Sequence, residues 1–190
     1  MSLKKFIDEN IKKHLEDRGF PTDAKIFIDT EGDIAYFPLY NLSGKLVGYQ
    51  KYNPKGTKGK RGPSEDPKYK NIVTKENPEK GVSYTALYGL ETLDKRPFVF
   101  VVEGVFDAAK LMQLKLPVVA VLANDPKKLR NFFFVLQKKV IAWIDRDKAG
   151  RKLRNLADYF IETPEPYKDL GEMPLADVKK LLISKKIIRK

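Results

Sequence analysis

The sequence predicts an α/β protein in which a parallel sheet flanked by helices follows a small α+β N-terminal subdomain with an antiparallel hairpin. The first observation is the alternation of short apolar runs with helical stretches after residue 98, a pattern typical of strands buried on both faces. The second is a pair of β-prone segments around a turn before residue 53, which is typical of a hairpin. The third is a length of 190 residues, 42% of them hydrophobic, which suffices for one well-packed domain with a smaller appendage.

The N-terminal half is predicted to be a helix followed by strands. Apolar residues recur at helical spacing between residues 3 and 18, and Gly19 and Pro21 then end the helix. Turn-forming residues at 41–44 indicate a hairpin between the second and third strands. The strands themselves are expected at residues 24–28, 34–40 and 45–52.

The segment from residue 53 to residue 67 is predicted to be a solvated loop. It has no large apolar side chain and is rich in Gly, Pro and basic residues. Lys58, Lys60 and Arg61 make it a candidate phosphate-contacting arm. An ordinary flexible connector would have the same composition, so both interpretations stay open.

From residue 98 onwards the chain is predicted to alternate between strands and helices. The apolar runs that begin at Phe98, Pro117 and Lys139 are interpreted as three buried parallel strands. The remaining elements are helices at residues 106–114, 127–138, 150–157 and 175–188 and a short strand at residues 159–162. Trp143 lies inside the third apolar run and is predicted to belong to the core, whereas His14 lies among charged residues and is predicted to be at the surface.

The chain is strongly basic. It has 37 Lys and Arg residues against 25 Asp and Glu residues, which gives a formal net charge of +12. Such a protein favours polyanionic partners, because its cations displace the counterions condensed on phosphates. Nucleic acid is therefore the first candidate partner and an acidic membrane surface the second. A basic balance that serves only solubility is the alternative.

Two absences in the sequence limit the classes of protein. Without cysteine, the chain forms neither a disulfide framework nor a Cys-ligated zinc site. The charged N-terminus lacks the apolar stretch of a signal peptide, and no segment approaches the length of a membrane span. We therefore expect a cytoplasmic protein without a membrane partner.

Acidic residues gather where the predicted strands end. Open parallel sheets hold their ligands at this edge, so we expect the carboxylates to line one crevice. Carboxylates without neighbouring His or Cys suit Mg²⁺ or Mn²⁺, and two such ions can activate a hydroxyl and neutralise charge on a phosphate. Each pair alone is compatible with helix caps or solvated turns, but three pairs after apolar strands favour a metal site. The pairs are Glu103 with Asp107, Asp145 with Asp147, and Asp169 with Glu172.

Two of these motifs resemble those of the Toprim family, which primases, topoisomerases and some nucleases share. One is the strand that ends in Glu103 and Gly104, and the other is Asp145-Arg146-Asp147 with its continuation to Arg151. The continuation, Asp-x-Asp-x-Ala-Gly-Arg, is similar to that of bacterial and phage DnaG-type primases in particular. Three segments upstream also resemble primase segments, namely residues 37–48, 67–71 and 86–90.

The resemblance implies the catalytic core of a DnaG-type DNA primase, which synthesises short RNA primers on single-stranded DNA with Mg²⁺ or Mn²⁺. By this resemblance Glu103, Asp145 and Asp147 are catalytic, and they hold the metal together with Asp107 and Asp169. The residues expected to contact the template or nucleoside triphosphates are Lys58, Lys60, Arg61, Lys68, Tyr69, Lys70, Arg146, Lys148 and Arg151. Lysine binds phosphate as a point charge, and tyrosine can stack on a base. An alternative is that the cations beside Asp145 and Asp147 serve only to balance the charge of these carboxylates, so both roles stay open.

The resemblance also implies a division of the chain. An N-terminal α+β subdomain is expected at residues 1–95, a Toprim domain at 96–175 and a basic C-terminal helix at 176–190. We expect no counterpart of the family's zinc-binding and helicase domains, since the chain has no cysteine and about fifteen residues follow the last motif. We therefore expect a stand-alone, phage-like core that works with a separate template-recognition subunit or a replicative helicase.

Two other functions stay open at this point. A Toprim endonuclease would cut a phosphodiester with the same metals, and a binding module that has lost its activity would organise nucleic acid in a replication complex. The upstream primase-like segments favour the primase over the nuclease. The presence of Glu103, Asp145 and Asp147 argues against the inactive module.

Overall fold

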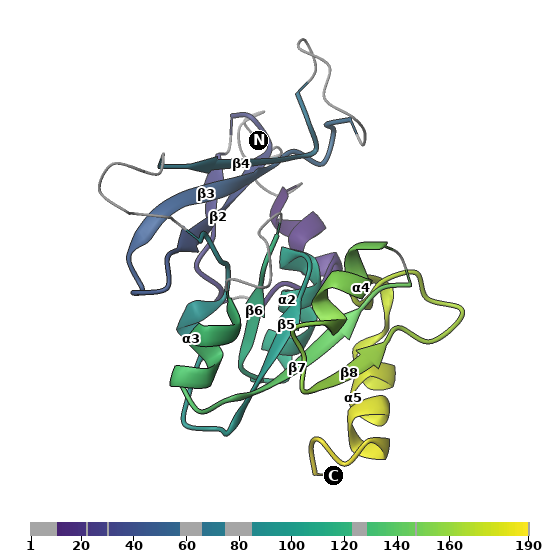
Figure 1. The fold of residues 1–190 in the computed structure, drawn as a ribbon. Helices are drawn as coiled ribbons and strands as arrows, with labels where there is room; N and C mark the ends of the chain where they lie inside the picture. The colour runs from purple at the N-terminus through teal and green to yellow at the C-terminus, as the bar shows by residue number, and fades with distance from the viewer. Residues whose placement is uncertain are drawn as a thin grey trace. The chain divides into compact units, whose positions relative to one another are not determined.

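A computed structural model describes residues 11–21, 23–29, 31–57, 66–74, 85–122, 129–146 and 148–189. The chain divides into two compact units (Figure 1). The first unit comprises Met1–Asp17 and Pro21–Tyr88, and the second comprises Arg18–Phe20 and Gly89–Lys190.

The first unit is built on a four-stranded antiparallel sheet with the order β1-β2-β3-β4. Its strands are β1 Phe27–Asp29, β2 Ile34–Tyr40, β3 Leu46–Tyr52 and β4 Tyr69–Val73. His14, from helical residues 11–17, stacks on Tyr52, and Phe37 packs edge-on against Tyr88. Because Phe37 and Tyr52 point to the same side of the sheet, this face forms the core of the unit.

The predicted hairpin of β2 and β3 is confirmed, while two details of the sheet differ from the prediction. β1 is shorter than expected and covers only Phe27–Asp29. β4 was not predicted as a strand, because its cations indicated a contact segment rather than an element of the sheet. Tyr69, Ile72 and Val73 are strand-forming residues and are the signal that would have found it.

The second unit contains the predicted parallel sheet, with the order β6-β5-β7-β8. Its strands are β5 Phe98–Val102, β6 Val118–Ala120, β7 Lys139–Ile144 and β8 Tyr159–Glu162. The two central strands are apolar and almost fully buried, as expected for strands covered by helices on both faces. The predicted α/β fold class is therefore confirmed.

Helices flank this sheet (Figure 1). They are α2 Val105–Gln113, α3 Arg130–Val135, α4 Lys148–Arg154 and α5 Leu175–Ser184, with 3₁₀ turns η2 Leu90–Thr92 and η4 Leu170–Glu172. Two helices end earlier than predicted because a nearby residue adopts the left-handed conformation, which does not continue a helix. Gln137 has a φ of 51° after α3, and Lys186 has a φ of 58° after α5.

The two aromatic residues singled out in the sequence behave differently. Trp143 is buried in the core of the second unit, as predicted. His14 is half-buried rather than fully exposed, because its ring lies on Tyr52 and its Nε2 is 2.7 Å from the Tyr52 hydroxyl. Among the described residues, no helix combines the length and apolar character needed to cross a membrane.

Candidate metal centre and nucleic-acid contacts

The candidate metal centre lies at the carboxyl edge of the parallel sheet. The chain passes from β5 to β6 on one side of β5, whereas β7 lies on the other side. Such a reversal leaves a crevice outside the carboxyl ends of the two central strands. Glu103 directly follows β5 and Asp145 directly follows β7, so the order of the strands brings both carboxylates to this edge.

Asp107 connects two parts of this edge. It lies in the first turn of α2, where its Oδ2 accepts a 3.1 Å hydrogen bond from the backbone amide of Gly104. Its Oδ1 accepts a 3.0 Å hydrogen bond from the amide of Gly171, in η4. Asp169 caps η4, since its Oδ1 accepts a 2.9 Å hydrogen bond from the amide of Glu172. The third acidic pair is thus held next to the first.

Negative charge accumulates around Asp107. Burial first, and then the charges of Asp145 and Asp169, raise the pKa of its carboxyl group from 3.8 to about 7, although hydrogen bonds from the amides of Gly171 and Gly104 act in the opposite direction. The direction of these effects means that the three carboxylates interact electrostatically. A bound cation would relieve the cost of keeping them ionised together.

Asp145 is positioned from two sides. Its Oδ1 lies 3.4 Å from the hydroxyl of Thr163, a buried residue that also accepts a 3.0 Å hydrogen bond from Nε1 of Trp143. On the other side, a Cβ atom added to Gly150 would lie only 2.1 Å from the carbonyl oxygen of Asp145. Helix α4 therefore packs directly on the backbone of Asp145, and only glycine fits there. Sequence reasoning missed Thr163, because nothing but its place after β8 marks it.

The donor set fits the metal that the fold family implies. The carboxylates of Glu103, Asp107, Asp145 and Asp169 offer oxygen atoms alone, with Oε1 of Glu103 buried, and oxygen ligands are those that Mg²⁺ and Mn²⁺ prefer. Within the described ranges, no three Asp, Glu, His or Cys side chains are grouped closely enough to hold a metal ion as they stand. Asp147, the remaining predicted ligand, lies outside the described residues.

The predicted nucleic-acid contacts are described only in part. Arg146 forms a 2.6 Å ion pair with Glu165, and its Nε donates a 3.1 Å hydrogen bond to the carbonyl of Thr163. Its guanidinium group is thus held beside the end of β8. Outside the description are Lys58, Lys60 and Arg61 and the side chains of Lys148 and Arg151.

The predicted contact segment at residues 68–70 is divided between two faces of the sheet. Nζ of Lys68 lies 5.7 Å from the centre of the Tyr52 ring, and the ring of Tyr69 lies 5.1 Å from the same ring. Lys70 pairs with Lys51 across the strands and points to the opposite face, because side chains alternate along a strand. Lys68 and Tyr69 thus share a location that Lys70 does not.

This combination of an antiparallel sheet unit and a parallel sheet unit is similar to the fold of DnaG-type primase catalytic cores. The Aquifex aeolicus primase, solved with its zinc-binding and RNA polymerase domains, matches 95% of this chain at 24% identity with a TM-score of 0.59. The DnaG catalytic core matches 94% at 17% identity with a TM-score of 0.58. The primase fragment of the bacteriophage T7 primase-helicase protein matches 80% at 19% identity with a TM-score of 0.53.

The matches cover different shares of these structures. The chain spans 48% of the Aquifex structure, 61% of the T7 fragment and 76% of the DnaG core. No protein-family model matches the chain, and a comparison with curated proteins finds no significant match. At these identities the structural likeness establishes the fold, and the activity has to be argued from the site.

Proposed function

We propose that the chain is a primase-type nucleotidyltransferase, which synthesises short RNA primers on single-stranded DNA. The observation that carries the proposal is the gathering of carboxylates at the reversal point between β5 and β7, where the pKa of Asp107 is raised by burial and by the charges of Asp145 and Asp169. Joining nucleotides requires that negative charge on a triphosphate be neutralised. A centre rich in carboxylates serves this purpose when it holds divalent cations.

Glu103, Asp145 and Asp147 are the proposed catalytic residues and ligands of Mg²⁺ or Mn²⁺, and Asp107 and Asp169 complete the acidic site. When bound, the ions would supply Lewis-acid stabilisation of charge on the phosphate and lower the pKa of the attacking hydroxyl. The chain's own residues hold the geometry: Thr163 and the packing of α4 fix Asp145.

Cations near the acidic centre and in the first unit are proposed to bind the polyanionic reactants. Arg146, Lys148 and Arg151 follow β7 and suit the triphosphate of an incoming nucleotide, since a cation there offsets phosphate charge. The cations Lys58, Lys60, Arg61, Lys68 and Lys70, with Tyr69, suit the template strand. One structural neighbour, the bacteriophage T7 primase fragment, belongs to a primase-helicase protein, which supports a replicative helicase as a partner. Such an enzyme would act in the cytoplasm.

The test is a synthesis assay with the purified chain, a single-stranded DNA template, labelled ribonucleotides and Mg²⁺ or Mn²⁺. Template-dependent RNA of short length is the expected product. Asp145→Asn should abolish it, because the substitution removes a charge from the proposed metal centre and keeps the shape of the side chain. Asp17→Asn is the matched control, because the contact of Asp17 among the described residues is an exposed ion pair with Lys13 in the first unit.

A labelled DNA strand in the same reaction distinguishes the proposal from the nuclease. Cleavage of that strand that disappears with Asp145→Asn, without any RNA synthesis, would replace the proposal by a Toprim endonuclease. Equal RNA synthesis by the unmodified chain and by Asp145→Asn would disprove the assignment of the metal centre.

A further inference from the structure

The parallel sheet has a second edge, at the amino ends of its strands, which the proposed metal centre does not use. A groove of about 550 Å³ lies at this edge, within the second unit. Its walls come from the end of α3, from the connection to β7 and its first residue, and from the residue that precedes β8. The lining residues are called the amino-edge groove and are Phe134, Val135, Gln137, Lys138, Lys139 and Asp158.

The wall formed by α3 exposes apolar side chains. Phe133 points into the core and is 1% exposed, whereas Phe134 is 82% exposed and Val135 is 76% exposed. Successive residues of a helix point in different directions, so Phe133 anchors α3 while the next two side chains remain in water. Leu136, which follows them, is also exposed. Contiguous exposed apolar residues with a polar rim mark a binding surface more often than isolated ones do.

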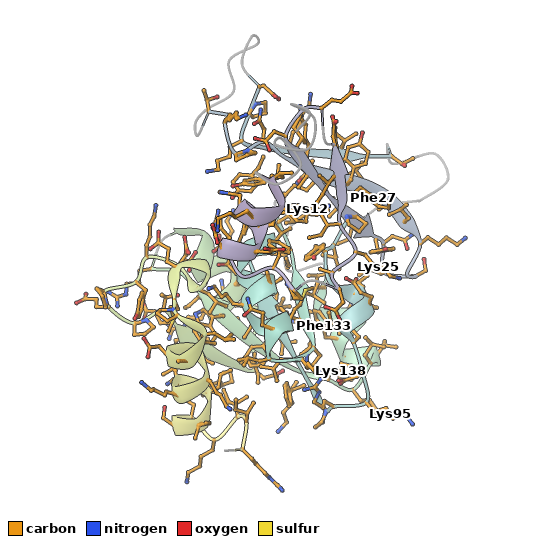
Figure 2. All side chains as sticks on the ribbon, turned by 180° about the vertical axis from the view of Figure 1, so that it is seen from behind. Lys12, Lys25, Phe27, Lys95, Phe133 and Lys138 are labelled. Atoms are coloured by element: carbon orange, nitrogen blue, oxygen red, sulfur yellow. The ribbon has the colours of Figure 1, made fainter. Side chains whose placement is uncertain are left out.

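Cations lie beside this apolar wall. Nζ of Lys138 donates hydrogen bonds to the carbonyl oxygens of Asp94, at 2.5 Å, and Arg96, at 2.7 Å. The segment that leads into β5 therefore lies next to the groove and brings the exposed Lys95 with it. Figure 2 shows Lys95 and Lys138 at the same end of the second unit. Lys139 is exposed as well and belongs to the lining.

The carboxylates at this edge are engaged within the unit. Oδ2 of Asp158 accepts a 2.7 Å hydrogen bond from the backbone amide of Val140. Asp94 forms an ion pair with Arg96, whose hydrogen bonds lower the pKa of the Asp94 carboxyl group. Since Arg96 balances Asp94, the residues named at this edge leave three lysines against one carboxylate. The groove is therefore apolar on one wall and positively charged around it.

We propose that the amino-edge groove binds an acidic amphipathic segment of a partner protein. Apolar side chains of that segment cover Phe134 and Val135, and its carboxylates pair with Lys95 and Lys139. Amphipathic segments bind grooves by their apolar face, and complementary charge selects and orients them. A peptide also has backbone N–H donors for Asp158. The phosphodiester backbone of a nucleic acid has acceptors alone, and the charge of Asp158 repels it.

A second copy of the chain is a poorer occupant of the groove. A symmetric dimer uses the same surface on both subunits, so the lysines of one groove would face those of the other. The formal net charge of +12 adds to this repulsion. The groove lies at the opposite edge of the sheet from Glu103 and Asp145. The proposal is thus independent of the catalytic assignment.

Peptide binding is measured by fluorescence anisotropy with the full chain. The probe is a labelled synthetic peptide that has Leu and Phe at helical spacing and Asp and Glu at the other positions. Phe134→Ser combined with Val135→Ser should lower the affinity by about tenfold or more, because the apolar side chains of the peptide lose their partners. Leu46→Ser is the matched control and should bind normally, since Leu46 is 61% exposed on β3 of the first unit.

The charge of the groove is tested by separate variants. Lys95→Glu combined with Lys139→Glu should also lower the affinity by about tenfold or more, because the carboxylates of the peptide then meet like charges. Lys25→Glu combined with Lys45→Glu is the matched control. It makes the same change in net charge at exposed positions of the first unit and should leave peptide binding nearly unchanged.

Several outcomes would overturn the proposal. Absence of peptide binding by the unmodified chain is one, and unchanged affinity in the double serine or double glutamate variant is another. An equal loss in either control would show that the effect is not local to the groove. A labelled oligothymidine strand and sedimentation test the other occupants. If the serine variant weakens strand binding or dissociates a dimer and the peptide does not bind, the groove serves nucleic acid or self-association instead.

A second measurement uses the unmodified chain and does not depend on the folding of a variant. The same peptide, with a benzophenone side chain in place of its Phe, is irradiated with the protein, and the crosslinks are located by mass spectrometry. Crosslinks within residues 130–139 are expected, and crosslinks found solely on the first unit would contradict the proposal. Asp145→Asn should bind the peptide like the unmodified chain, so failure of the catalytic assignment and failure of this site are distinguishable.

Discussion

The backbone amide of Gly171 donates a 3.0 Å hydrogen bond to Oδ1 of Asp107, a residue 64 positions earlier in the chain. This bond attaches η4 to the first turn of α2 and holds Asp169 close enough for its charge to act on Asp107. The acidic centre is therefore assembled by a contact between distant segments. Its consequences for stability and activity can be measured.

The stability of the metal-free chain should depend on the ionisation of Asp107. The pKa of this group is raised from 3.8 to about 7 by folding, so the folded state holds the proton more tightly than the unfolded state does. Its contribution is fully present below the unfolded pKa, and it is lost as the pH rises through the folded pKa. The loss between about pH 5 and pH 8 should be about 2–3 kcal/mol.

Asp107→Asn removes this titration and keeps one side-chain oxygen as an acceptor. Urea unfolding in EDTA at both pH values gives the comparison. The variant should become more stable relative to the unmodified chain as the pH rises. Parallel pH dependences of the two proteins would show that Asp107 is not the titrating group.

Glu103→Gln should reduce primer synthesis by at least about 100-fold. This is the upper end of the loss of activity expected when a residue around a bound metal is mutated. The substitution keeps the size of the side chain and removes one negative charge from the carboxyl end of β5. Folding and salt-dependent binding of single-stranded DNA should stay nearly unchanged, because phosphate contacts depend on the basic surface. Glu91→Gln, on the exposed turn η2, is the matched control and should retain activity. Full activity in Glu103→Gln would remove Glu103 from the site.

Gly150→Ala should destabilise the second unit and impair synthesis together. The added Cβ would lie 2.1 Å from the carbonyl oxygen of Asp145, so helix α4 or the Asp145 backbone has to move. Overpacking of this kind costs about 1–3 kcal/mol. Lys152→Ala, on the exposed side of α4, should change the free energy of unfolding by less than about 0.5 kcal/mol. A Gly150→Ala protein as stable and active as the unmodified chain would contradict the packing described for Asp145.

Thr163→Val should cost about 1–3 kcal/mol of stability, because the indole N–H of Trp143 loses its buried acceptor. Thr163→Ser keeps the hydroxyl and should recover most of that loss. Trp143 is the sole tryptophan in the chain, so its fluorescence follows both unfolding and the local change. The two variants should differ in stability; the same unfolding midpoint for both would mean that the hydroxyl contributes nothing.

Much of the fold was predictable because its signals are local. The runs that became β5 and β7 are continuous and apolar, and their order along the chain with intervening helices is sufficient to indicate a parallel sheet. β4 was not predicted, because its cations indicated a contact segment rather than a short edge strand. The ends of α3 and α5 were predicted too late, because a residue with a left-handed conformation follows each helix. The contact of His14 with Tyr52 was not predictable, since helical periodicity alone does not show which residue of the sheet a helical side chain meets.

The sequence by itself determined that Glu103 and Asp145 stand at the ends of apolar strands. Each of them directly follows its strand in the chain, so its position does not depend on contacts with other segments. Tertiary structure alone decided that Gly171 reaches Asp107, that Thr163 lies between Trp143 and Asp145, and which side chains share a face of the antiparallel sheet. These features depend on strand order, register and packing between distant segments. Such contacts leave no periodic pattern in the chain, since their energy comes from groups that meet only after folding.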